Sequence, residues 1–454
     1  MAILSIGGLA TGLDTNTLIA KLLAFEAQPL NDLQQEVSAT NQKKAVVADL
    51  KSRISALDSF ILGFQTESQI FPKKAASADE SVVKASASGS ATATSHVVKV
   101  AQLATSATVT SSGVASSTTI ISTAVGTFEF QVDGVTTTVN LTGATTLEDL
   151  RDLINAEDAG VTASIVDTGV GATPFQLVLR GDATGADNNI LVEDVDTIGI
   201  ADGTTLTFTR PVSAVNSQVT IDGVAIERST NEVSDVLEGL TLSLKSAAPT
   251  TDVGVTVSND TPALKAKISE LVNKLNDIFS FVNAKTAFND ATKTRGLLAG
   301  EPSAESTRRA LQNIMLSLIE DVGSYQALSN IGFKTNRQGI IELDSAALDA
   351  ALDANFESVG KLFLGDDVLA EIGISEKIAE LTDDLTDIDE RVSLFAAAER
   401  RLRDRVAYLN DRTDEQQRLL EKKEKALRAQ FANLEVLVSS LNQTSGFLQK
   451  QQSS

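Results

Sequence analysis

The chain has 454 residues, no cysteine, no tryptophan and one histidine, and its formal net charge is −22. The absence of cysteine excludes disulfides, thiolate nucleophiles and thiolate-bound metals, and His96 alone cannot build a histidine-rich zinc or copper site. Nucleic acids and anionic membranes are bound by clustered Lys and Arg, so the acidic balance argues against both as partners. We therefore expect a protein that is not an enzyme, with no catalytic, cofactor-binding or metal-binding residues and no cofactor.

The acidity is concentrated in the middle of the chain. From Ala101 to Glu227 there are three basic residues against sixteen acidic ones, a balance of −13. We interpret this segment as a solvated, self-repelling surface. No stretch approaches the roughly 20 apolar residues of a membrane span. The opening residues, MAILSIGGLATGLDTNT, have neither a basic region nor a long apolar core. We therefore expect no cleavable secretory signal, and either a cytoplasmic protein or export by a route that reads no such signal.

The first part of the chain is predicted to be helical. Helix is expected over residues 16–71, with Pro29 opening a second segment because the first turn of a helix tolerates proline. Apolar side chains recur there at the three- and four-residue spacing of one helix face. The predicted stripe runs through Leu30, Leu33, Val37, Thr40, Lys44 and Val47 and, after one skip, through Leu50, Ile54, Leu57, Ile61 and Phe64.

Strand patterns replace helix patterns from about residue 77 to residue 257. Residues 96–100 and 127–132 alternate between polar and apolar side chains. Asp133-Gly134 and Asp222-Gly223 are hairpin signals, because both residue types tolerate positive φ. Residues 145–155 read as one capped helix between strands. The middle of the chain is therefore predicted to form two β-rich domains, one inserted into the other.

Helix patterns return at Pro262 and end in a long apolar ladder. Residues 374–445 contain no Gly or Pro, and from Ile378 to Leu448 a 3,4 spacing covers twenty-one positions, of which fifteen are apolar. A stripe of that length predicts coiled-coil packing, in which the two helical arms come together. The predicted assembly seam is Leu381, Leu385, Ile388, Val392, Leu402, Leu420, Leu427, Leu434, Leu441 and Leu448.

Several seam positions are polar, and two interpretations of them stay open. In the first, the polar residues weaken the terminal part relative to residues 378–395, which gives a stable inner coiled coil and a looser leg. In the second, they face solvent at a helix break near residues 410–412. The positions are Glu399, Thr413, Gln416, Lys423 and Gln430.

Motifs that carry chemistry are incomplete. Gly169-Val170-Gly171 lacks the third glycine of a dinucleotide fingerprint and predicts a loop. Residues 182–188 offer calcium-type ligands without the EF-hand pattern, which favours a turn. His96 has no second ligand nearby in the sequence, and we expect a structural role for it. The acidic pairs at 366–367 and 383–384 are interpreted as cap or surface residues.

These patterns predict an α+β fold: long terminal helices that form a coiled-coil leg, with a β-rich head of two domains inserted between them. Residues 1–42 and 410–454 would form the terminal leg, disordered in the monomer, because its stripes have no partner before assembly. Residues 43–76 and 260–409 would form a helical coiled-coil domain. Residues 77–108 and 214–259 would form a β-rich head domain, into which a second one, residues 109–213, is inserted.

Several segments resemble one family. Residues 6–15, IGGLATGLDT, and the helix reaching residues 26–30 resemble the amino-terminal signature of flagellar filament cap proteins, also called hook-associated protein 2. Ile340 and Ile341 depart from the family's shorter Gly-x-Leu step. The other similar segments are residues 295–301, 328–333, 339–344, 359–363, 430–435 and 446–448.

The resemblance implies a protein that caps the distal tip of a growing bacterial flagellar filament. Such caps are homo-oligomeric rings of about five subunits. They promote the folding and insertion of exported flagellin and prevent its loss to the medium. The implied partners are further copies of the chain, flagellin, the hook–filament junction protein and a flagellar export chaperone. The implied location is extracellular, reached by the flagellar type III route without a cleaved signal peptide.

Two alternatives to a cap protein come from different classes. Another axial flagellar protein would share the helical arms, but residues 328–343 and 359–363 favour a cap. A host-surface adhesin would bind host glycans with its Ser- and Thr-rich head. Glycan pockets usually present aromatic platforms, and the head offers only scattered Phe, such as Phe128 and Phe208.

Overall fold

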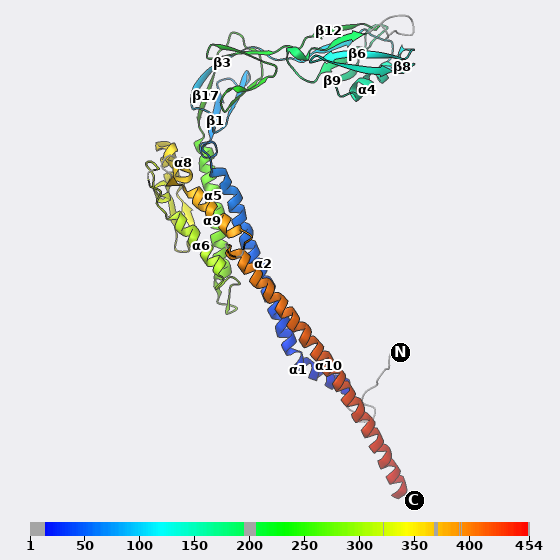
Figure 1. Cartoon of the computed structure of the whole chain (residues 1–454), viewed down its shortest axis with the longest axis vertical. Helices are drawn as coiled ribbons and strands as arrows, with labels where there is room; N and C mark the ends of the chain where they lie inside the picture. The colour runs from blue at the N-terminus through cyan, green and yellow to red at the C-terminus, as the bar shows by residue number, and fades with distance from the viewer. Residues whose placement is uncertain are drawn as a thin grey trace. The chain divides into compact units, whose positions relative to one another are not determined.

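The computed structural model describes residues 14–194, 206–320, 322–366, 371–389, 391 and 393–452. The chain divides into two compact units (Figure 1). A helical unit combines the chain up to residue 66 with the chain from residue 265 onward, and a β-rich unit comprises residues 67–264. Each unit is described by itself below.

The two longest helices of the helical unit are α2 (Gln28–Ile61) and α10 (Leu394–Gln452), and α1 (Thr15–Glu26) directly precedes α2. The Asp14 side chain caps α1 by accepting a hydrogen bond from the Thr17 amide at 3.0 Å. Pro29 lies in the first turn of α2, where the missing N–H costs no helical hydrogen bond. Helices α2 and α10 lie side by side in Figure 1 and run antiparallel.

Shorter elements pack around the end of α2 where its side chains become fully buried. They are η1 (Leu62–Phe64), α5 (Thr261–Thr286), α6 (Pro302–Met315), η3 (Leu328–Ile331), α7 (Ser345–Ala354), α8 (Phe356–Leu364) and α9 (Ile374–Thr386). Three small hairpins accompany them: β18 (Phe288–Asn289) with β19 (Thr294–Arg295), β20 (Phe333–Thr335) with β21 (Ile341–Leu343), and β22 (Gly365–Asp366) with β23 (Glu371–Ile372).

The β-rich unit begins with α3 (Glu67–Ile70) and contains two hydrophobic cores. One core lies between a five-stranded and a three-stranded antiparallel sheet, where Val98, Val255 and Leu242 are at most 1% exposed. The first sheet has the order β1 (Lys73–Ser77), β17 (Val253–Asn259), β3 (Ser95–Gln102), β13 (Ser217–Ile221), β14 (Val224–Arg228); the second has β15 (Glu232–Leu237), β16 (Leu240–Leu244), β2 (Val83–Ala87).

The other core of the β-rich unit contains Phe128, Phe130 and Leu177. Helix α4 (Leu147–Ala156) packs against it through Leu150, and Thr146 and Asp149 form a reciprocal capping box at the start of that helix. Separate sheets surround this core. One has the order β12 (Phe208–Val212), β4 (Thr108–Ser111), β10 (Phe175–Gly181), β9 (Val161–Asp167), and another has the order β11 (Leu191–Asp194), β6 (Gly126–Val132), β7 (Val135–Leu141). A two-stranded sheet pairs β5 (Ile120–Ser122) with β8 (Thr145–Thr146).

Two chain segments join the two cores of the β-rich unit. Thr105 and Val215 exchange backbone hydrogen bonds at 3.0 and 3.3 Å, so the segments pair as a short ribbon. On one side of the ribbon, the Asn231 side chain accepts a hydrogen bond from the Ala104 amide and donates one to its carbonyl, at 2.7 and 2.8 Å. An asparagine amide can pair in this way with a strand edge as another strand would.

The structure confirms the α+β fold and most of the predicted elements. Asp133 and Asp222 adopt positive φ in their hairpin turns, and residues 182–188 form a turn around Gly185, at φ 107°. His96 Nδ1 donates a hydrogen bond to the Asp222 carboxylate at 2.7 Å, which is the expected structural role. The boundaries of the four predicted parts, and the disorder of the two terminal segments in the monomer, stay predictions.

One prediction about the helices was wrong. The ladder from residue 378 onward is not one unbroken helix, because α9 ends at Thr386 and α10 begins at Leu394. The Asp389 amide donates to the Asp387 side chain at 2.7 Å, and the Arg391 amide donates to the Asp389 side chain at 2.9 Å. Such local bonds to aspartate compete with helical hydrogen bonds and stop the helix without Gly or Pro.

Candidate assembly surface

Helices α2 and α10 form an antiparallel pair that is tightly packed at one end. Along α2, Val47, Leu50, Ile54, Leu57 and Ile61 are fully buried, which confirms this half of the predicted stripe. Their spacing of three, four, three and four residues places them on one face of the helix. The first half of the stripe is only half-buried, and Lys44 was placed wrongly in it: Lys44 is exposed, and Lys43 takes the half-buried position. On α10 the last fully buried side chain is that of Leu409, which is 1% exposed, among the residues described up to 448.

Ion pairs between α1–α2 and α10 establish the antiparallel register. Lys51 pairs with Glu399 at 3.8 Å, Glu36 with Arg405, and Glu26 with Lys423. The residue numbers on α10 therefore rise as those of their partners on α2 and α1 fall, as they must for antiparallel helices. These side chains are 23–52% exposed, and such pairs contribute about 0–1 kcal/mol each. They therefore select the register more than they stabilise the fold.

A buried carboxylate lies at the tightly packed end of this helix pair. Glu301 is 1% exposed; its Oε1 accepts a hydrogen bond from Arg401 Nη2 at 2.6 Å, and its Oε2 lies 2.9 Å from Lys43 Nζ. Burial raises the pKa of Glu301, but the contacts with Lys43 and Arg401 outweigh burial and bring the pKa below its usual range. Glu301 is also the N-cap residue of α6, so one charge joins α2, α6 and α10.

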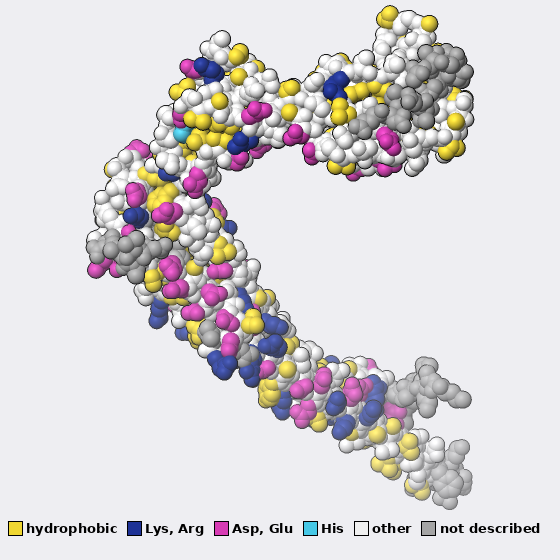
Figure 2. Space-filling model, turned by 45° about the horizontal axis from the view of Figure 1, so that its top comes forward, with side chains coloured by type: hydrophobic (Ala, Val, Ile, Leu, Met, Phe, Trp, Pro, Cys, Tyr) yellow, Lys and Arg dark blue, Asp and Glu magenta, His cyan; other side chains and the backbone are white. Residues whose placement is uncertain are grey.

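We call one part of the helical unit the leg. It consists of α10 beyond Leu409, residues 410–452, together with α1 and the start of α2. No side chain of the leg described on α10 is fully buried. Exposed hydrophobic side chains gather toward the C-terminal end of this helix (Figure 2). On α1, Leu22 and Phe25 are 46% and 70% exposed, and on α10 the exposed set is Leu419, Leu434, Val436, Leu437, Leu441 and Leu448.

The predicted seam residues divide into three groups. Leu385 and Leu402 are buried, and Leu381, Leu420 and Leu427 are half-buried. Leu434, Leu441 and Leu448 are 45%, 59% and 55% exposed, so within one chain they pack against no partner as a seam would. Ile388 was placed wrongly in a helical seam: it lies in the break after α9 and is 90% exposed. Val392 lies outside the described residues.

The heptad spacing predicted for the leg also differs from the observed burial. From Leu420 onward the half-buried positions include Glu424, Leu427, Phe431, Glu435 and Val438, which repeat after eleven residues. An eleven-residue repeat corresponds to a slight right-handed supercoil, whereas a seven-residue repeat requires a left-handed one. Helix α1 also contacts α10, with Glu26 paired to Lys423. Along the leg the half-buried position shifts from the predicted Leu434 to Glu435.

The two interpretations of the polar seam positions can now be compared. The alternative break near residues 410–412 is wrong, because α10 is continuous there. The proposed stable inner stretch, residues 378–395, is interrupted instead. Glu399 and Lys423 take part in the ion pairs described above, and Thr413 donates its hydroxyl to the Leu409 carbonyl at 2.8 Å. Gln416 is half-buried and Gln430 is exposed.

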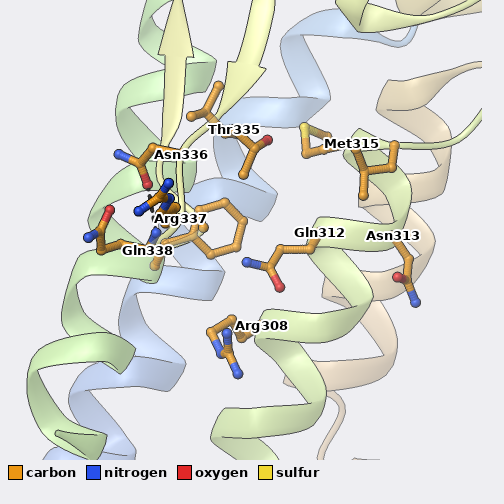
Figure 3. A pocket seen from close by; sticks show the side chains of 12 residues that line it. Arg308, Gln312, Asn313, Met315, Thr335, Asn336, Arg337 and Gln338 are labelled. Atoms are coloured by element: carbon orange, nitrogen blue, oxygen red, sulfur yellow. Dashed lines mark hydrogen bonds between the residues drawn. The ribbon is translucent and has the colours of Figure 1, made fainter.

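A second surface feature of the helical unit lies between α6 and the β20–β21 hairpin. A hollow of about 410 Å³ separates Arg308 and Gln312 on α6 from Arg337 and Gln338 at the hairpin tip (Figure 3). Gly339 closes the tip at φ 77°, and a Cβ there would lie 2.2 Å from the Gln312 amide nitrogen. The positive φ favours glycine at this position, whereas the Gln312 side chain could move aside from a Cβ.

The part of the chain that the structure describes holds no group of three or more His, Cys, Asp or Glu side chains arranged to bind a metal ion. No described helix combines the length and hydropathy that crossing a membrane requires. The features that remain as candidates for function are the buried charge cluster, the leg and the hollow beside the β20–β21 hairpin.

Profiles of known families match most of the chain. The flagellar hook-associated protein 2 C-terminus matches residues 214–443, and the N-terminus of the same family matches residues 11–107. The chain belongs to the flagellar hook-associated protein 2 family. A flagellin hook IN motif also matches residues 127–183, which lie around the second core of the β-rich unit.

Relatives within the hook-associated protein 2 family align with two thirds or more of the chain. The A-type flagellar hook-associated protein 2 of Pseudomonas aeruginosa is 28% identical over 468 residues, covering 97% of this chain and 96% of that protein. Its relative from Salmonella typhimurium strain LT2 is 32% identical over 330 residues, covering 68% and 67%. The crystal structure of the D1-D2-D3 domains of the flagellar cap protein FliD from Escherichia coli aligns with a TM-score of 0.63 and 26% identity, covering 78% of this chain and 99% of that one.

The signature segments of the hook-associated protein 2 family have structural roles in the described residues. Residues 295–301 end at the buried Glu301, and residues 339–344 contain β21, the second strand of the hairpin beside the hollow. Residues 359–363 lie in α8, where Val359 and Phe363 are fully buried. Residues 6–13 of the amino-terminal signature lie outside the described residues.

Proposed function

We propose that this chain caps the distal tip of a growing bacterial flagellar filament as a homo-oligomeric ring of about five subunits. There it promotes the folding and insertion of exported flagellin and prevents the loss of flagellin to the medium. Family membership and the similarity to the E. coli cap protein support this role. The role is that of a structural assembly factor, without catalysis.

The observation that carries the proposal is the exposed leg. Leu434, Leu437 and Leu441 are 45–59% exposed on one helix. Burying apolar area is favourable by about 25 cal/mol per Å², so a leg of this kind gains stability when other subunits or the filament surround it. A cap protein needs a surface of this kind, because it must dock on the filament end and be released as each flagellin is added.

The same proposal assigns the partners and the route. The leg would contact flagellin and the hook–filament junction protein after export, and a flagellar export chaperone before it. Export would use the flagellar type III route without a cleaved signal peptide, to an extracellular site at the filament tip. A chain without cysteine suits that route, since no disulfide has to be reduced before the unfolded chain is threaded.

A deletion strain tests the proposal. Cells that lack the gene for this chain should have no filaments and should release monomeric flagellin into liquid medium, and the full-length chain should restore filaments and swimming. Hook assembly in the same strain serves as the control, because it precedes capping and should be unchanged. Normal filaments in the deletion strain would refute the capping role.

A further inference from the structure

The most exposed large hydrophobic side chain in the described part of the protein is Ile388, at 90%. It lies between two carboxylates, Asp387 and Asp389, in the break between α9 and α10. An isoleucine exposed to this extent contributes no hydrophobic stabilisation to the folded chain. Burying this side chain against a partner would remove its apolar surface from water.

Local hydrogen bonds flank Ile388 on both sides. Asp389 is held by a bidentate contact with Arg391, with Nη2 to Oδ2 at 2.9 Å and Nε to Oδ1 at 3.2 Å. The Ser393 hydroxyl donates to the Leu385 carbonyl at 2.6 Å, which bridges the ends of α9 and α10. Asp387 adopts an extended conformation, at φ −49° and ψ 150°. We call the segment Asp387–Asp389 the knob.

An apolar hollow on the same helical unit has the shape to receive such a side chain. A space of about 290 Å³ adjoins the larger hollow of Figure 3 and shares Met315, Leu316, Thr335 and Ile341 with it. Phe333 completes its apolar wall. Leu316 is 73% exposed at its rim, so the hollow is not filled by the chain's own side chains.

Strand β20 offers a free edge to this hollow. The Asp344 amide donates to the Gly332 carbonyl and the Asn336 amide donates to the Ile340 carbonyl, so the main-chain groups of Phe333 and Thr335 point away from β21. The opposite edge of the hairpin is already covered, because the Asn276 side chain pairs with both main-chain groups of Ile341 at 2.8 Å. An extended segment can add to a free edge of this kind by β-augmentation.

The charges of the knob and the hollow are complementary. Arg308 is paired with Glu305 at 2.8 Å, but Arg337 at the hairpin tip has no ionic partner among the described residues. The Asp387 carboxylate makes no ion pair in the same part of the chain, whereas that of Asp389 is taken by Arg391. One unpaired carboxylate thus flanks the exposed isoleucine, and one unpaired guanidinium flanks the apolar hollow.

We propose that the knob of one copy inserts into the hollow of a second copy, with Ile388 against Met315, Leu316 and Phe333 and Asp387 beside Arg337. Two different surfaces meet in such a contact, so it is heterologous, and repeating it closes a ring when the rotation per subunit allows closure. The inference rests on the proposed ring and names the surface that forms it.

Disulfide trapping tests the contact directly, because the natural chain has no cysteine. Full-length Ile388→Cys and Thr335→Cys variants are mixed under oxidising conditions. A disulfide needs Cα atoms about 4.4–6.8 Å apart, so a cross-linked dimer should form in the mixture and not with either variant alone. Thr335→Cys mixed with Val125→Cys, whose valine is 83% exposed in the β-rich unit, is the matched control and should stay uncross-linked.

Self-association gives the second measurement. Ile388→Asp should weaken self-association in analytical ultracentrifugation by about tenfold or more, and Val125→Asp should leave it unchanged. Asp387→Arg and Arg337→Asp should each weaken it, and the double variant should recover most of the loss. Circular dichroism of each variant monitors folding.

The outcomes separate this contact from the proposed function. The proposed contact is overturned if the Ile388→Asp variant associates as strongly as the wild type and no cross-link forms between positions 388 and 335. It is also overturned if the wild-type chain stays monomeric at every concentration. If the Ile388→Asp variant still caps filaments, the capping role survives and the ring uses another surface. A deletion strain with normal filaments would refute the capping role whatever the cross-links show.

Discussion

The Glu301 carboxylate accepts a hydrogen bond from Arg401 at 2.6 Å across a separation of 100 residues, and Lys43 lies 2.9 Å away on the other side. Removing both cations leaves a buried, uncompensated carboxylate, which typically costs about 3–5 kcal/mol. We expect Lys43→Met plus Arg401→Met to lower the free energy of unfolding in urea by about that amount. Arg412→Met, which breaks an exposed pair on α10 with Glu415, is the control and should cost under about 0.5 kcal/mol. A double variant as stable as the wild type would show that Glu301 does not join the helices.

The same carboxylate makes stability depend on pH. The pKa of Glu301 is lower in the folded chain than in the unfolded one, so its contribution is fully present above the unfolded value of about 4.3 and is lost as pH falls through the folded value. The stability difference between the wild type and Glu301→Gln should therefore shrink between about pH 5 and pH 3. Urea titrations at several pH values measure it. A difference that stays constant over this range contradicts the prediction.

The leucines of the leg should matter for capping and not for the stability of the monomer. Leu434 and Leu441 are 45% and 59% exposed, so replacing both with alanine should change the unfolding free energy by less than about 1 kcal/mol in total. Swimming should be lost and flagellin should appear in the medium. Leu402→Ala is the matched control: its leucine is 6% exposed on the same helix, and the change should cost about 2–5 kcal/mol.

That comparison requires that the leg variant is secreted, which immunoblotting of the medium establishes. Full motility with normal filaments would show that these leucines are not an assembly surface. A lower melting temperature of the purified full-length variant would show that these leucines stabilise the monomer instead.

Residues 1–42 and 410–454 should exchange their amide hydrogens rapidly in the isolated chain. Few side chains are buried there: Thr15 and Ile19 on α1 are, at 4% exposed, but α2 has no fully buried side chain before Val47, and α10 has none described after Leu409. Local opening costs little where few side chains are buried, so protection from exchange should be low. Hydrogen exchange by mass spectrometry on the monomer measures this. Protection equal to that of α5 in those segments would overturn the prediction.

Residues 109–213 should be removable as a unit. Thr105 and Val215 pair in the ribbon that joins the two cores, so the cut ends lie side by side and a short turn can reconnect them. We expect the shortened chain to fold and to unfold cooperatively, because the remaining core around Val98 and Leu242 is unchanged. Loss of near-native circular dichroism in the shortened chain would show that the two cores depend on each other.

The sequence predicted the elements that local patterns determine. The second half of the α2 stripe, the Thr146 cap and the Asp-Gly turns depend on residues a few positions apart, and all are present. The break after Thr386 was missed because aspartate and serine stop that helix, whereas the prediction considered only Gly and Pro. A cluster of Asp and Ser at residues 387–393 was the available signal.

The candidate site was less predictable because its parts are far apart in the sequence. Glu301 is held by residues 258 positions before it and 100 positions after it, and no spacing rule connects them. The burial register of the leg depends on which helix covers α10, and α1 contacts it as well as α2. Tertiary contacts of this kind decide which face of a long helix is buried, and a heptad pattern alone does not.

The length of α10 beyond its last fully buried residue has a mechanical consequence. From Leu409 to Gln452 the helix continues for 43 residues, or about 65 Å at 1.5 Å per residue. That segment is a lever whose pivot lies in the tightly packed end of the unit. A tilt of about 10° at the pivot displaces the far end by about 11 Å, roughly two turns of helix. Small rearrangements around Leu409 are thereby converted into strokes of nanometre size at the C-terminal end.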